Sequence, residues 1–68
     1  MTNEEKQFYS EYLRKEIRFL VTERLPIEKR YLSWAKKSKS QRMIELALHN
    51  IEAANLSLAC LKQELEEL

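Results

Sequence analysis

The residues with the most obvious chemistry are a histidine and two glutamates on one predicted helix. Glu45 and Glu52 lie four before and three after His49, the single histidine, so the three side chains share one helical face. Imidazole and carboxylate groups at this spacing could bind a metal or exchange protons. We expect a solvated face instead, because His49 points outward from the predicted core and no further carboxylates converge on it.

Other catalytic groups are equally sparse. Cys60 is the only cysteine, and its neighbours are apolar or acidic, which favours an unreactive thiol. The chain has no glycine to cradle a phosphate, and no serine, histidine and acid spaced as a triad. We therefore predict a protein that is not an enzyme and that has no metal and no cofactor.

The composition indicates one small helical domain, residues 1–68. Of the 68 residues, 44% are apolar and 34% charged, and the near absence of Gly, Pro and Asp argues against hairpin turns and strands. No apolar run is long enough to cross a bilayer, and the N-terminus lacks the features of a signal peptide. With one cysteine and no disulfide framework, these features favour a cytoplasmic protein with no membrane contact.

Helix signals predict an antiparallel helical hairpin, with arms at about 3–37 and 40–67 joined by a basic turn at about 37–40. Thr2 and Glu5 form a capping box, and Ser38 or Ser40 could cap the second arm. Pro26 interrupts the first arm and predicts a kink, or else the start of a separate helix. We favour the kink, because the apolar stripe continues through it at seven-residue spacing: Leu13, Leu20, Ile27 and Trp34.

The second arm has regular coiled-coil heptads. One core position holds Ile44, Ile51, Leu58 and Leu65, and the other holds Ala47, Ala54, Leu61 and Leu68. Pairing the arms about Lys39 places bulky Tyr31 and Arg24 opposite Ala47 and Ala54, as interdigitated packing requires.

A second set of apolar residues remains outside this core. This set is Phe8, Tyr12, Phe19, Leu46, Ala53, Leu56 and Cys60. Five of its members share a heptad position that places them on one side of the hairpin: Tyr12, Phe19, Leu46, Ala53 and Cys60. An exposed surface of this kind marks an interaction site. We expect a second copy to cover it and form a homodimeric four-helix bundle; an unlike protein, or a third helix folding back, are the alternatives.

Charge is sorted along the chain although the net charge is only +1. Residues 14–42 carry ten basic side chains against three Glu, while both ends are acidic. The predicted partner-binding residues are those around the turn, Lys36, Lys37, Lys39 and Arg42.

These features favour a small adaptor or regulator that binds and modulates, for example inhibits, a larger protein, as is common in bacteria and phages. The alternative is a nucleic-acid-binding hairpin dimer that uses the basic turn and the Lys and Arg residues of the first arm. Against this alternative, no aromatic side chain is interleaved with these basic residues for base stacking.

Overall fold

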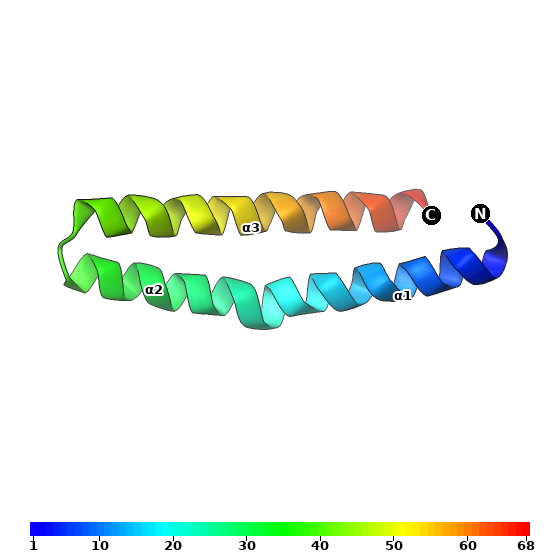
Figure 1. The fold of residues 1–68 in the computed structure, drawn as a ribbon, viewed down its shortest axis with the longest axis horizontal. Coiled ribbons are helices and arrows are strands. Elements are labelled where there is room, and N and C mark those ends of the chain that lie inside the picture. The colour runs from blue at the N-terminus through cyan, green and yellow to red at the C-terminus, as the bar shows by residue number, and fades with distance from the viewer.

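The computed structural model describes residues 1–68 and is entirely helical (Figure 1). The first arm contains α1 (Asn3–Phe19), a π-helical segment η1 (Leu20–Arg24) and α2 (Leu25–Lys37), and the second arm is α3 (Gln41–Glu67). Both α1 and α2 pack against α3, so the arms lie side by side and the two termini share one end. The result is a rod of 52 × 16 × 11 Å with a turn end and an open end.

Both arms begin at the side-chain caps expected from the sequence. Thr2 Oγ1 accepts from the Glu5 N–H at 3.1 Å, and Ser40, not Ser38, caps α3 by accepting from the Met43 N–H at 3.4 Å. The capping box differs in one detail, because the Glu5 carboxylate accepts from the Thr2 hydroxyl at 3.1 Å instead of from its backbone N–H.

The turn reverses the chain through one left-handed residue. Lys39 has φ 56°, and its N–H donates to the Lys36 carbonyl at 3.2 Å, while the Ser38 N–H donates to the Trp34 carbonyl at 2.9 Å. This is the usual way of satisfying the last carbonyls of a helix, although the left-handed position normally holds Gly or Asn. A lysine there costs backbone strain.

The predicted core of α3 is confirmed by burial. Ala47 and Ala54 are fully buried, and the flanking heptad residues are half-buried: Ile44, Ile51, Leu58, Leu61 and Leu65. Leu68 is the exception, because it lies beyond the last turn of α3 and is 40% exposed. The alanines allow the two helix axes to approach closely where the bulkier first arm packs against them.

The predicted core of the first arm is wrong after Leu20. Leu13 and Leu20 are buried as expected, but the buried residues further on are Leu25 and Ala35, while Trp34 is 51% and Ile27 58% exposed. Leu20 and Ala35 are 15 positions apart, one more than two heptads. The contact stripe has therefore moved by one residue between α1 and α2.

The π-helical segment accommodates this extra residue within one turn of the first arm. Its hydrogen bonds span five residues, as from the Leu25 N–H to the Leu20 carbonyl, so it takes up one residue more than an α-turn. Pro26 explains the position, because it cannot donate a bond to Thr22 and its ring crowds that carbonyl. Within the segment, the Thr22 hydroxyl donates to the Arg18 carbonyl at 2.7 Å.

The first arm remains one arm through this segment. Leu20, Arg24 and Leu25 all keep right-handed helical backbone angles, and the ribbon bulges outward between α1 and α2 without a turn (Figure 1). This favours a continuous arm over a separate helix beginning at Pro26. The kink of its axis stays a prediction.

Candidate functional site

The shifted stripe enlarges the apolar surface on one side of the hairpin. A residue that precedes a core residue by one position lies 100° around the helix from it. Because the arms are antiparallel, this rotation leads to the same side of the hairpin on both. The residues in that position, here called the apolar flank, are Tyr12, Phe19, Ile27, Trp34, Leu46, Ala53 and Cys60.

Most of this flank is open to solvent. Tyr12, Phe19 and Leu46 are each about half exposed, as are Ile27 and Trp34, and the unpaired Cys60 is also exposed. Only Ala53 is half-buried. Apolar side chains therefore follow one side of both arms from the turn end toward the open end, with Glu23 as the charged residue between Phe19 and Ile27.

The structure places the remaining residues of the predicted face differently. Phe8 lies one turn before Tyr12 and is 78% exposed, so it extends the apolar flank at the open end. Leu56 is 62% exposed but lies two residues after Ala54, about 200° around α3, and so belongs to the outer surface of that helix.

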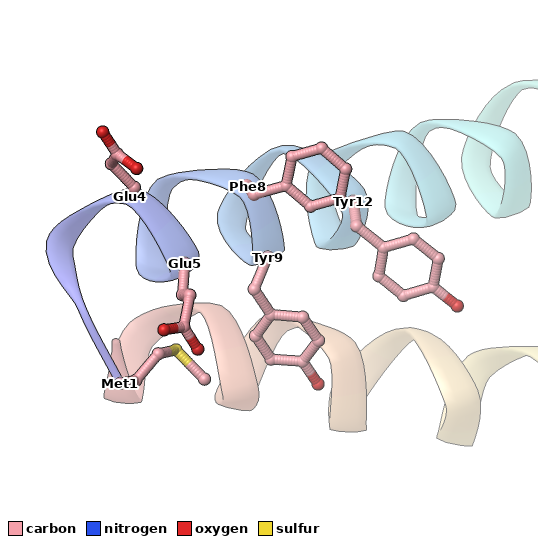
Figure 2. A pocket seen from close by; sticks show the side chains of 6 residues that line it. All are labelled: Met1, Glu4, Glu5, Phe8, Tyr9 and Tyr12. Atoms are coloured by element: carbon pink, nitrogen blue, oxygen red, sulfur yellow. The ribbon is translucent and has the colours of Figure 1, made fainter.

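A shallow hollow lies where the first arm reaches the open end (Figure 2). It has a volume of about 570 Å³ and is lined by Met1, Glu4, Glu5, Phe8, Tyr9 and Tyr12. The Tyr9 and Tyr12 rings stack with centroids 6.1 Å apart, and Tyr9 reaches across to α3, where its hydroxyl donates to Glu64 Oε2 at 2.9 Å. The hollow thus combines aromatic walls with acidic groups.

The bond to Glu64 also affects the ionisation of Tyr9. The neutral phenol donates the hydrogen bond and the carboxylate repels a phenolate, so the pKa of Tyr9 is raised above its ordinary value of 10.0. Partial desolvation acts in the same direction. The Tyr9 phenol therefore stays protonated and linked to α3 at neutral pH.

The opposite end of the rod is basic and carries an exposed indole. The four predicted partner-binding residues are all exposed: Lys36, Lys37, Lys39 and Arg42. Trp34 lies one turn before Ser38 and packs against Tyr31, with ring centroids 5.7 Å apart and planes tilted by 42°. Trp34, which the seven-residue spacing places in the core, is 51% exposed, because the π-helical segment turns it out of the core.

Two residues of the apolar flank, Ile27 and Trp34, were assigned to the core by their spacing. The sequence contains one sign that the contact stripe moves by one residue. Leu25 and Leu32 are also seven apart, but they lie outside the stripe that runs from Leu20 to Trp34. In the structure Leu25 is buried and Leu32 half-buried, in line with Ala35.

The metal and proton-exchange candidates are not brought together by the fold. His49 is exposed, no group of three or more His, Cys, Asp or Glu side chains is placed to hold a metal ion, and no buried side-chain polar atom lacks a partner. None of the helices combines the length and the apolar character needed to cross a bilayer.

Comparison of the chain with protein-family models, with curated proteins and with solved structures found no match. The chemistry of the hairpin surface is therefore the basis for assigning a function.

Proposed function

We propose that this chain is a small, non-enzymatic regulatory protein that binds a larger protein partner through its apolar flank. The observation that carries the proposal is the length of this flank, which joins three half-exposed aromatic side chains, Tyr12, Phe19 and Trp34, along one side of a 52 Å rod. Contiguous exposed apolar surface of this kind marks interaction sites in soluble proteins. Aromatic side chains also dominate the binding energy of protein interfaces.

The shape of the flank indicates what it would bind. Two antiparallel helices present a shallow groove between parallel ridges, and one or two further helices complete a three- or four-helix bundle on such a surface. We therefore propose an amphipathic helix or helical pair of the larger protein as the binding element. Regulation follows if that element has another role in the partner when this chain is absent.

The same flank would pair with a second copy when no partner is bound. Two hairpins stacked through their apolar flanks form a four-helix bundle, and two-fold homodimers are the commonest assemblies. In this scheme the larger protein replaces one hairpin of the homodimer. A kink at Pro26 would set how closely the two halves of the first arm follow either occupant.

The proposal is tested by photo-crosslinking in the native cells. A benzophenone amino acid is placed at Phe19 or Ile27 on the apolar flank, with matched controls at Val21 and Leu48, which are exposed to a similar degree on the opposite side. We expect the flank positions to crosslink to one larger protein and the controls to give no such product. Crosslinks to the hairpin alone would overturn the larger partner while leaving the homodimer intact.

A nucleic-acid function is the second candidate, and the exposed Trp34 is the observation that favours it. An indole that neighbours Lys37, three residues on along the helix, could stack on a base while the lysines of the turn contact phosphates. Binding of this kind weakens steeply as salt rises, whereas docking through the apolar flank is nearly indifferent to salt. Changing Lys36, Lys37 and Lys39 to Ser would abolish nucleic-acid binding and spare the apolar flank.

A further inference from the structure

The hairpin exposes more surface than a compact chain of its size. Its accessible surface is 5581 Å², against about 4,500 Å² expected for a folded monomer of 8.2 kDa. Its radius of gyration is 15.6 Å, against about 11 Å for a compact 68-residue domain. The excess of about 1,000 Å² is close to the 800 Å² that each partner contributes to a standard interface.

The core of the isolated hairpin is correspondingly thin. Six residues are buried, three of them alanines, and Leu13 is the only large side chain that is fully buried. Small domains with so little core usually need disulfides, metals or oligomerisation. This chain has one cysteine and no metal-binding cluster, so a second copy is the occupant of the apolar flank that the energetics favour.

The two ends of the rod carry opposite charge. Residues 36–42 at the turn end hold four basic side chains and no acidic one. At the open end, residues 1–13 hold three Glu and one Lys, and residues 62–68 also hold three Glu and one Lys. A two-fold axis along the rod would bring the turns of both copies together and add their positive charges, whereas an axis across the rod would place each basic turn beside an acidic open end.

The hollow at the open end has the chemistry to receive the turn end of a second copy. Phe8, Tyr9 and Tyr12 offer aromatic walls for the half-exposed Trp34 of the other copy, and Glu4 and Glu5 offer carboxylates for its lysines (Figure 2). Aromatic pairs and cations over aromatic rings add to the apolar area buried. Both hollows are filled at once, because the interface is isologous.

We infer that two copies associate as an antiparallel dimer, in which the hollow lined by Phe8, Tyr9 and Tyr12 receives Trp34 and the basic turn of the other copy. This inference rests on the pairing in the proposed function and adds its orientation and contacts. The inferred dimer leaves the outer surface of α3, with Leu56, and the opposite flank, with Val21 and Leu48, outside the interface.

The test combines a distance with a crosslink. Spin labels are attached to the turn through Ser38→Cys in a Cys60→Ala background, after light scattering has established the mass of that variant. The antiparallel dimer predicts a distance between labels close to the 52 Å length of the rod, and a parallel dimer predicts about 20 Å or less. A benzophenone amino acid at Phe8 should crosslink to the peptide of the other copy that contains Trp34, and one at Val21 should give no crosslink between copies.

The possible failures are distinguishable. A mass of 8.2 kDa at every concentration overturns the dimer and this inference, but leaves the apolar flank available to a larger partner. A mass of twice that value with a short distance between labels, or with Phe8 crosslinked to the first 15 residues of the other copy, overturns the antiparallel arrangement alone.

Discussion

The apolar flank and the opposite side of the hairpin come from the same two arms, and they differ by one step around each helix. Residues that follow the core residues by one position, here called the basic flank, are Arg14, Val21, Lys29, Lys36, Leu48, Asn55 and Lys62. Four of these seven are basic, whereas all seven matching positions of the apolar flank are apolar. The hairpin therefore has a solvated side and a side suited to burial.

The π-helical segment matters more to the apolar flank than to the fold. If residues 20–25 formed a regular α-helix, Ile27 and Trp34 would fall in the core and Glu28 and Ala35 would lie outside it. The fold would still be a hairpin, but the apolar flank would end at Phe19 on the first arm. π-bulges occur frequently at functional sites, where they reposition side chains in this way.

The largest effect is expected from placing a charge on the apolar flank. Leu46→Lys should weaken the dimer at least about 100-fold. Both copies place the substituted residue in an isologous interface, and burying each lysine costs about 1.4 kcal/mol or more of association free energy. The dissociation constant is measured by sedimentation equilibrium.

Leu48→Lys is the matched control for this variant. Leu46 and Leu48 lie on the same helix and are 51% and 49% exposed, but they belong to opposite flanks. The control should stay within about threefold of the wild type, as exposed substitutions usually do. Equal weakening by both variants would show that the two flanks do not differ in function.

The next effect comes from removing the cause of the π-helical segment. Pro26→Ala should allow an uninterrupted α-helix in which the stripe of Leu13 and Leu20 continues into Trp34, two heptads after Leu20. Trp34, now 51% exposed, should become buried, with blue-shifted fluorescence and weaker quenching by acrylamide.

Deletion of Thr22 together with Pro26→Ala is the control, because the shortened α-helix has Ala35 two heptads after Leu20 and so leaves Trp34 outside the core. Both proteins are compared as monomers in the Leu46→Lys background, so that burial in the dimer does not contribute. Trp34 that is quenched as strongly in Pro26→Ala as in this control would contradict the role assigned to the extra residue.

The sequence was sufficient for the parts of the fold that depend on local signals. Thr2 and Ser40 as caps, the heptads of α3 and the position of the turn follow from side-chain chemistry and from an unbroken period. Trp34 could not be placed in this way, because two stripes compete after Pro26. One is more apolar, through Ile27 and Trp34, and the other contains Leu25, Leu32 and Ala35.

Which of these stripes is buried depends on packing against α3, that is, on contacts between residues far apart in the sequence. The aromatic side chains at the open end were recognised as surplus, but their arrangement into a hollow depends on how far the first arm extends along α3. The bond between Tyr9 and Glu64 joins residues 55 positions apart and has no signature in the spacing of either helix.

A smaller effect is expected at the basic turn, where charge and backbone geometry can be separated. Lys39→Gly and Lys39→Gln remove the same charge, but only Gly relieves the left-handed conformation at φ 56°. The glycine variant should be more stable than the glutamine variant by about 0.5–1 kcal/mol, since part of the relief is offset by the greater freedom of Gly in the unfolded chain.

This difference is measured by urea unfolding of both variants under identical conditions. The two should bind equally well to any polyanion or protein that recognises the turn by charge alone. A glutamine variant as stable as the glycine variant would mean that the turn accommodates its left-handed residue without cost.

The smallest effect is expected at the open end, from Tyr9→Phe. Because the folded-state pKa of Tyr9 is raised above 10.0, its contribution to stability is present in full below about pH 10 and is lost as the pH rises through the raised value. The free energy of unfolding of the wild type should therefore fall more steeply above pH 10 than that of the variant. Glu64→Gln should also flatten this dependence, since it removes the charge that opposes the phenolate. A wild type and a Tyr9→Phe variant with the same slope above pH 10 would mean that the bond between the first arm and α3 does not persist in solution, and the hollow beside it would then lose its fixed wall.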